Sequence, residues 1–304
     1  MEPHLQKVTK GTSDIRDGDL VPQRLTGEGM VNPLAVEVER PRLNCSESMS
    51  LLASGPGAGD VRPLALRIMP VGDSITVGYT DNPDWNVPFE FGYRSGLYSR
   101  LKNSGCPFQF VGTSGEPWEP WDKHHGDPSR GGAVRPALDL RDLGQDHHEG
   151  YSGKDIAYIH SIITNRIAVN RPDVILLMIG INGINASSPT QLSQLVGTIV
   201  DFAPKVHLVV AQITPYRTYN ADLFNYNTAI HDTLVPNFAA KGARISAVDL
   251  YTPFLADSAD PMSIGSGLHA NEINHPSAVL YDKMAQAWFE SIMQLGLRKG
   301  ENYG

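Results

Sequence analysis

Four short motifs contain the residue types that nucleophilic catalysis requires. Ser74 lies in "GDSIT", Gly153 in "GYSG", Asn182 in "GIN" and His275 in "NHP". A serine hydroxyl is a poor nucleophile near neutral pH and needs an adjacent imidazole, such as that of His275, to take its proton. An oxyanion needs fixed donors, and the backbone N–H groups of Ser74 and Gly153 and the Asn182 amide can provide them. Together these residues form a complete set for acyl transfer.

The imidazole also needs a partner on its second nitrogen that fixes its tautomer and orientation. Glu272, three residues before His275, can supply that carboxylate. Asp249 in "AVDLY" is a rival acid, although we expect it to end a strand. His269 is a rival base, but Ser266 stands three residues before it and no proline follows. We therefore assign the pair His275 and Glu272.

The four motifs resemble, in order and spacing, the four blocks of the SGNH (GDSL-type) hydrolases. The resemblance covers Leu66 to about Leu295, and "HPSAVLYDKMAQAWF" is similar to the C-terminal helix of this family. It implies a flavodoxin-like α/β/α sandwich, no cofactor, no metal, and ester hydrolysis through an acyl intermediate on Ser74. "GDSIT" and the C-terminal block look most like the carbohydrate O-acetylesterase branch. Arylesterases, short-chain lipases and thioesterases share the same blocks and stay open as alternatives.

Two positions depart from the family pattern. The third block usually reads G-x-N-D, whereas Gly183 follows Asn182 here, so the support of that aspartate is missing or supplied elsewhere. The last block usually reads D-x-x-H, and Glu272 stands in the Asp position. The longer side chain could approach His275 differently or leave it to a backbone carbonyl. A catalytically impaired carbohydrate-binding module on the same fold is therefore the non-enzymatic alternative.

Each of these residues also has a purely structural interpretation. Ser74 could cap a helix, Gly153 could be an ordinary turn glycine, and Asn182 could cap the helix after its strand. His275 could simply precede a helix whose first residue is Pro276. Four motifs in the family's order, each at a strand-to-helix junction, make coincidence a poor explanation. The hydrolase interpretation is therefore preferred.

The elements that must position these residues alternate along the chain. Short apolar runs, rich in β-branched residues, predict strands at 64–72, 108–113, 173–180, 206–214 and 243–250. Helical spacing predicts helices at about 88–103, 154–170, 190–203, 221–241 and 276–296. Such alternation predicts a three-layer α/β/α sandwich around a parallel, five-stranded sheet, whose strand ends carry the site.

Two segments fall outside this alternation. Residues 1–62 are polar and lack a regular period, which predicts an N-terminal arm preceding a hydrolase domain at 63–304. Such an arm could also join two subunits. The segment 114–149 predicts a long loop insertion, in which Trp118 and Trp121 could hold a sugar ring or simply pack the loop.

Composition excludes several partners. The formal net charge of -8 and the absence of a basic run argue against nucleic acid binding. No apolar stretch is long enough for a membrane span, and the N-terminus lacks a secretion signal. The localisation stays open: the sequence as it stands would be cytoplasmic, whereas relatives that act on polysaccharide are often exported. The expected partner is a small ester or an acetylated carbohydrate.

A metal-dependent hydrolase is the last alternative. Its ligands would come from histidines and aspartates of the long loop and its end: His124, His125, Asp127, Asp146, His147 and His148. Their spacing matches no recurring metal site, and solvated surface histidines are the simpler explanation. Cys45 and Cys106 can form at most one internal bridge, and neither has a metal or redox spacing.

Overall fold

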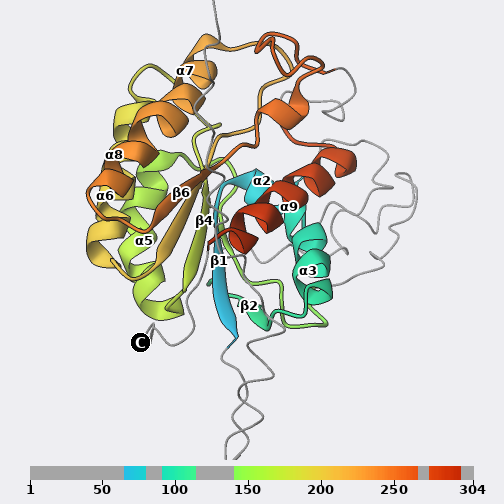
Figure 1. Ribbon diagram of the computed structural model, residues 1–304, viewed down its shortest axis with the longest axis vertical. Helices are drawn as coiled ribbons and strands as arrows, with labels where there is room; N and C mark the ends of the chain where they lie inside the picture. The colour runs from blue at the N-terminus through green and yellow to red at the C-terminus, as the bar shows by residue number, and fades with distance from the viewer. Residues whose placement is uncertain (1–64, 80–90, 114–139, 266–273, 296–304) are drawn as a thin grey trace, which may run out of the picture. The chain divides into compact units, whose positions relative to one another are not determined.

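The computed structural model describes residues 65–79, 91–113, 140–265 and 274–295 (Figure 1). The predicted arm, residues 1–62, lies outside these ranges, so its boundary with a domain at 63–304 stays a prediction. Most of the predicted 114–149 insertion lies outside them as well. All elements discussed below belong to the described residues.

The centre of the fold is a parallel sheet with the strand order β2-β1-β4-β5-β6. Its strands are β1 (Leu66–Gly72), β2 (Phe108–Phe110), β4 (Val174–Met178), β5 (His207–Ala211) and β6 (Ile245–Val248). This order is the 2-1-3-4-5 order of flavodoxin-like folds. The predicted parallel sheet is confirmed, with six strands among the described residues instead of the five expected. A two-residue strand, β3 (Glu149–Gly150), also pairs with β1 and was not predicted.

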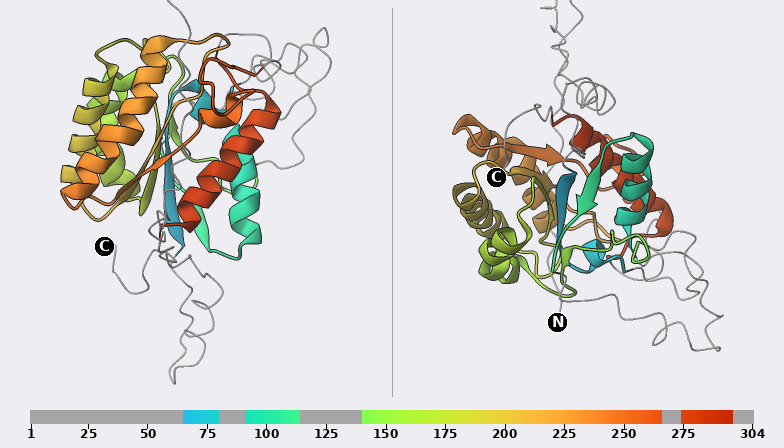
Figure 2. Two further views of the ribbon diagram at one scale, coloured as in Figure 1. Left: turned by 45° about the horizontal axis from the view of Figure 1, so that its top comes forward. Right: turned by 90° about the horizontal axis from the view of Figure 1, so that it is seen from below.

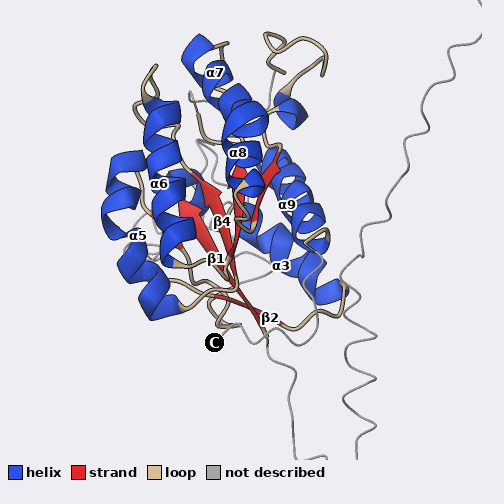
Figure 3. Cartoon of the chain, turned by 60° about the vertical axis from the view of Figure 1, so that its left-hand side comes forward, coloured by secondary structure: helices blue, strands red, loops and turns tan. Residues whose placement is uncertain are grey.

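Helices cover both faces of the sheet (Figures 1, 2 and 3). One face carries α3 (Tyr93–Asn103) and α9 (Ala278–Met293). The other carries α5 (Ile156–Asn170), α6 (Ser188–Phe202), α7 (Ala221–Ala229) and α8 (Val235–Ala240). The predicted three-layer sandwich is therefore confirmed. Among the described residues, no helix combines the length and apolar character that a membrane span requires.

Two local features differ from the predicted helices. A four-residue helix, α2 (Ser74–Val77), follows β1 and is too short to show a helical period in the sequence. The helix predicted at 221–241 is divided by a π-helical turn, η2 (Ile230–Leu234). Pro236 follows this turn, and because proline has no N–H the regular hydrogen-bond ladder cannot continue through it.

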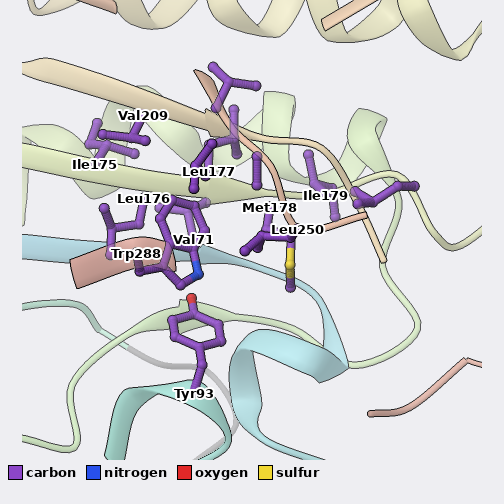
Figure 4. Close-up of a cluster of buried hydrophobic side chains, with 14 of the residues drawn as sticks. Val71, Tyr93, Ile175, Leu176, Leu177, Met178, Ile179, Val209, Leu250 and Trp288 are labelled. Carbon is purple, nitrogen blue, oxygen red and sulfur yellow. The ribbon is translucent and has the colours of Figure 1, made fainter. Parts of the chain in front are cut away.

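Large aromatic side chains fill the core between the sheet and α3 and α9 (Figure 4). Trp288 and Tyr93 are 0% exposed, with ring centroids 5.8 Å apart. Val71 and Leu176, from neighbouring strands, are also 0% exposed; because Val71 pairs with Leu177, these two side chains point to opposite faces of the sheet. Burying one such large side chain stabilises the fold by about 1.5–3 kcal/mol. The strand ends that carry the site residues are therefore supported by a closely packed core.

Candidate active site

Three adjacent strands end at the same level of the sheet. Gly72 at the end of β1 pairs with Gly150 of β3 on one side and with Met178 of β4 on the other. The carboxyl ends of parallel strands meet at one edge, where ligands bind in open α/β sheets. The predicted nucleophile and oxyanion donors follow these three strand ends by a few residues: Ser74, Gly153 and Asn182.

Ser74 and His275 meet at this edge although they are 201 residues apart in the chain. The Nε2 atom of His275 lies 2.8 Å from the Oγ atom of Ser74, which is a hydrogen-bond distance. Ser74 is 5% exposed, and His275 is half-buried just ahead of α9. The arrangement can transfer a proton from the hydroxyl to the imidazole.

The short helix α2 fixes Ser74 as its first residue. Asp73, not Ser74, is the N-cap: its Oδ1 atom accepts the N–H of Ile75 at 3.0 Å. The Ser74 carbonyl accepts the N–H groups of Gly78 and Tyr79 at 2.9 and 3.1 Å. The interpretation of Ser74 as a helix cap is therefore wrong, and its hydroxyl is available to His275.

Arg94 of α3 holds the other end of α2. Its guanidinium is 1% exposed and donates to the carbonyls of Thr76 at 3.1 Å, Val77 at 3.0 Å and Asp146 at 2.6 Å. Desolvation by burial lowers the Arg94 pKa to about 10, so the group still carries its charge at neutral pH. A cation at the C-terminus of a helix also interacts favourably with its dipole. Arg94 therefore fixes the helix that carries Ser74.

Asp73 is a buried carboxyl group directly beside the candidate nucleophile. Burial raises its pKa from the usual 3.8 to about 7, while the Ile75 N–H and the charge of His275 act in the opposite direction. Asp73 therefore titrates near neutral pH, next to the imidazole. The sequence motif places Asp73 before Ser74, but only the folded structure reveals its burial.

The segment that carries Gly153 is anchored by a buried carboxylate, Glu149, which is 0% exposed. Its partners come from the segment after β2, from Tyr151 and from α5. They are Thr113 N and Oγ1, both at 2.6 Å, the Tyr151 hydroxyl, Asn170 Nδ2 at 2.9 Å, and Arg166 Nε at 3.3 Å. The backbone N–H of Tyr151 also bonds to Gly72 O at 3.0 Å. Gly153 follows with φ +69°, a conformation that favours glycine. This anchoring fixes where the loop leaves the sheet.

Asn182 is tied to the same loop through its side chain. Its Nδ2 atom donates to the carbonyl of Lys154 at 3.0 Å. An amide nitrogen carries two hydrogens, so this bond leaves one for a ligand. Gly183, at the position of the missing aspartate, has φ +73°, which explains the glycine but supplies no carboxylate.

Comparisons with known proteins identify the fold. The chain matches no protein-family model and no curated protein. Among solved structures it is similar to the Clostridium thermocellum family 3 carbohydrate esterase, with 28% identity and a TM-score of 0.55 over 76% of this chain and 98% of that one. The protein has the SGNH hydrolase fold.

Two further structures share this SGNH fold. One is a mutant acetyl esterase with an acetate ion, at 18% identity and a TM-score of 0.57. The other is a carbohydrate esterase family 3 protein from Talaromyces cellulolyticus, at 19% identity and a TM-score of 0.51. Each match covers 76% of this chain and 98% of the other. The neighbours support the prediction of a carboxylic ester hydrolase.

Several predicted site residues lie outside the described part of the SGNH fold. They are Glu272, the rival base His269, and the tryptophans Trp118 and Trp121. Asp249 is described: it directly follows β6, and its Oδ1 atom accepts the N–H groups of Tyr251 and Thr252 at 2.8 and 2.9 Å. The Oδ1 atom of the rival acid thus binds backbone N–H groups of the turn that follows its own strand. The expectation that α9 starts at Pro276 is wrong, because the helix begins at Ala278.

The metal alternative finds no support in the ranges that the structure covers. No group of three or more histidine, cysteine or acidic side chains there could hold a metal ion. His148 is buried, its Nδ1 atom accepts the Gly150 N–H at 2.9 Å, and burial lowers its pKa well below 6.5. His124 and His125 lie outside the described residues. Cys45 also lies outside the described residues.

Proposed function

We propose that the protein is a serine esterase that removes short acyl groups, chiefly acetyl, from carbohydrate. The observation that carries the proposal is the 2.8 Å contact between His275 Nε2 and Ser74 Oγ at the carboxyl edge of the sheet. A serine gains nucleophilic strength when an imidazole accepts its proton. This pairing is what acyl transfer through a serine requires.

In the proposed reaction, Ser74 Oγ attacks the ester carbonyl carbon while its proton moves to His275 Nε2. The carbonyl oxygen becomes an oxyanion, which the N–H groups of Ser74 and Gly153 and the Asn182 amide stabilise. The carbon–oxygen bond to the alcohol then breaks, and the leaving alkoxide takes the proton from His275. These steps leave an acyl group on Ser74.

Water completes the cycle by the same chemistry in reverse order. His275 takes a proton from water, the hydroxide attacks the acyl carbon, and the proton returns to Ser74 Oγ as the carboxylic acid leaves. Glu272 is proposed to orient His275 through its second ring nitrogen. Replacement Glu272→Gln should lower kcat less than His275→Ala if a backbone carbonyl shares this task. Equal activity of Glu272→Gln and the wild type would remove Glu272 from the mechanism.

The nucleophile is tested by covalent labelling. A fluorophosphonate should label Ser74 in the wild-type protein, and Ser74→Ala should abolish both labelling and turnover of an aryl acetate. Ser161→Ala is the matched control, because Ser161 is an exposed serine on α5 whose hydroxyl donates to Tyr158 O at 2.7 Å. The control should keep full activity. Labelling of any serine other than Ser74 would refute the assignment.

The carbohydrate substrate is supported by the nature of the 28% identical neighbour, a carbohydrate esterase. Trp118 and Trp121 are proposed to hold the sugar. We expect acetyl esters of carbohydrate to outperform simple acetyl esters in kcat/KM, since contacts to a remote sugar lower the barrier. Trp118→Ala and Trp121→Ala should impair deacetylation of acetylated xylan far more than hydrolysis of an aryl acetate.

Acyl length separates this proposal from a lipase or a thioesterase. A small acyl pocket should make acetyl the best substrate and octanoyl negligible in a series of aryl esters. An open apolar groove would instead gain up to about 0.8 kcal/mol for every methylene buried. A preference for octanoyl would discard the carbohydrate assignment and keep the general esterase one.

The predicted arm is proposed to contribute no catalytic group, because all four motifs follow Leu64. Removal of residues 1–62 should therefore leave hydrolysis of small aryl esters largely unchanged. A truncated protein that folds but has lost activity would contradict this and would point to a role of the arm at the site or between subunits.

A further inference from the structure

Two tyrosine hydroxyls bind the short backbone segment that leads from β4 to Asn182. The Tyr226 hydroxyl donates to the carbonyl of Ile179 at 2.6 Å. The Tyr216 hydroxyl donates to the carbonyl of Ile181 at 2.5 Å. These carbonyls belong to residues two apart, and the second immediately precedes Asn182. The path of the backbone into Asn182 is therefore fixed at two points.

Both tyrosines are themselves held in place. Tyr226 is 0% exposed on α7, and Tyr216 is half-buried in the segment after β5. Asn227, next to Tyr226, binds that segment with its side chain: Oδ1 accepts the Ile213 N–H and Nδ2 donates to the Ile213 carbonyl, both at 2.8 Å. Helix α7 thus anchors both hydroxyl groups.

The backbone segment and Tyr226 fit closely at Gly180. A Cβ atom added at Gly180 would lie 2.8 Å from the Tyr226 ring and hydroxyl oxygen, and its φ of +127° is one that side chains rarely adopt. Glycine is required where two groups approach this closely. The backbone after β4 can therefore pack against Tyr226 only because residue 180 is a glycine.

Burial also keeps both hydroxyls protonated. Desolvation raises the pKa of Tyr226 and of Tyr216 above 10, and the neighbouring Asp73 carboxyl raises both further. A neutral phenol is a hydrogen-bond donor, whereas a phenolate is not. The two bonds to the backbone carbonyls consequently persist across the neutral pH range.

We propose that Tyr216 and Tyr226 are positioning residues that hold Asn182 for its contact with the oxyanion. They fix its backbone from one side, while the bond from Asn182 Nδ2 to Lys154 O fixes its side chain from the other. They replace the support that an aspartate at the position of Gly183 would give. The inference rests on the proposed esterase function, in which Asn182 is an oxyanion donor.

The first test is Tyr216→Phe, which removes one hydroxyl and keeps the ring. We expect kcat for an aryl acetate to fall about 5- to 30-fold with KM nearly unchanged, because a displaced donor loses its contact chiefly in the transition state. Loss of the whole donor in Asn182→Ala should cost more, about 10²–10³ in kcat. Tyr226→Phe should also lower kcat. It replaces Tyr216→Phe in this experiment if Tyr216→Phe does not fold.

A double-mutant cycle separates positioning from general loosening of the fold. Once Asn182 is replaced by alanine, the Tyr216 hydroxyl has no donor to position, so Tyr216→Phe should then change kcat less than twofold. Residues that act through one another show such non-additivity, whereas independent effects multiply. The melting temperature of each variant is measured, and kcat is expressed per folded enzyme.

Tyr251→Phe is the matched control. Its hydroxyl also donates to a backbone carbonyl, that of Pro261 at 2.7 Å, and it is 6% exposed. That bond is remote in the chain from Asn182, so kcat should stay at the wild-type value. An inactive wild type would refute the esterase proposal and this inference with it. An active wild type with unchanged kcat in Tyr216→Phe, or with multiplicative effects in the cycle, would overturn the inference alone.

Discussion

Tyr79 stacks on the imidazole of His275, with ring centroids 6.0 Å apart and ring planes inclined by 26°. Tyr79 follows Gly78, the C-cap of α2, and its N–H donates to Ser74 O at 3.1 Å. Its carbonyl accepts the hydroxyl of Tyr281 from α9. One residue thereby connects the helix of the candidate nucleophile with the ring of the candidate base.

The first prediction concerns this stack. Tyr79→Ala should lower kcat for an aryl acetate about 3- to 10-fold, because an aromatic pair contributes about 0.5–1.5 kcal/mol and its loss frees the His275 ring to rotate. Tyr79→Phe keeps the ring and should retain nearly all activity. If both variants were equally impaired, the stacking would not be the cause.

The second prediction uses the burial of Asp73. A carboxyl group whose pKa rises from 3.8 to about 7 on folding binds its proton more tightly in the native state. Its contribution to the free energy of unfolding is therefore full below pH 4, is lost as the pH rises to about 7, and stays lost above it. Asp73→Asn cannot ionise, but its side-chain oxygen can still accept the Ile75 N–H.

Urea denaturation at several pH values tests this linkage. The stability of Asp73→Asn relative to the wild type should rise between pH 4 and 7, by at most about 1.4 kcal/mol per pH unit. Asp155→Asn is the control: Asp155 caps α5 in the same way, accepting the Tyr158 N–H at 2.9 Å, but is exposed. If the stability of Asp73→Asn and of the wild type changed with pH in parallel, the pKa of Asp73 would not be raised on folding.

The sheet and its helices were predictable because their signals are local. The run Val174–Met178 is apolar throughout and buried throughout, as expected of a strand covered on both faces. The helix ahead of Pro172 ends at Asn170, its predicted last residue. Apolar runs and prolines carry their structural meaning in a few neighbouring residues, so a single sequence suffices to find them.

The contacts that refine the site could not be predicted. Tyr216 and Tyr226 bind backbone carbonyls 35 and 47 residues away, and a carbonyl has no signature in the sequence. The burial of Glu149 likewise depends on partners from separate elements. Strand β3 has only two residues, too few for a period of two to appear. Such features follow from the tertiary fold alone.

The third prediction compares two carboxylates in ion pairs. Glu149→Gln should lower the free energy of unfolding by about 1–3 kcal/mol, because the buried carboxylate accepts hydrogen bonds from Thr113 and Asn170 that an amide cannot all replace. Asp282→Asn should cost at most about 1 kcal/mol, since its pair with Arg100, at 2.8 Å, lies at the surface with Asp282 63% exposed. If urea denaturation showed the same loss of unfolding free energy for both variants, the burial of the carboxylate would not determine its contribution to stability.

The last prediction compares two arginines of the same helix, α3. Lysine in place of Arg94 offers a single nitrogen where the guanidinium serves three separate carbonyls, so Arg94→Lys leaves at least one buried carbonyl without a donor. The free energy of unfolding should fall by about 1–3 kcal/mol. Because two of these carbonyls belong to α2, the position of Ser74 should also change and fluorophosphonate labelling of the folded protein should slow.

Arg100→Lys provides the comparison for this last variant. Arg100 lies on the same helix, but its partners include the exposed Asp282 and Gln286 at 2.8 and 2.7 Å, and none of them belongs to α2. Its replacement should cost less than about 1 kcal/mol and leave the labelling rate of Ser74 unchanged. Folded Arg94→Lys protein that is labelled at the wild-type rate would mean that Arg94 stabilises the fold without fixing the helix that carries the nucleophile.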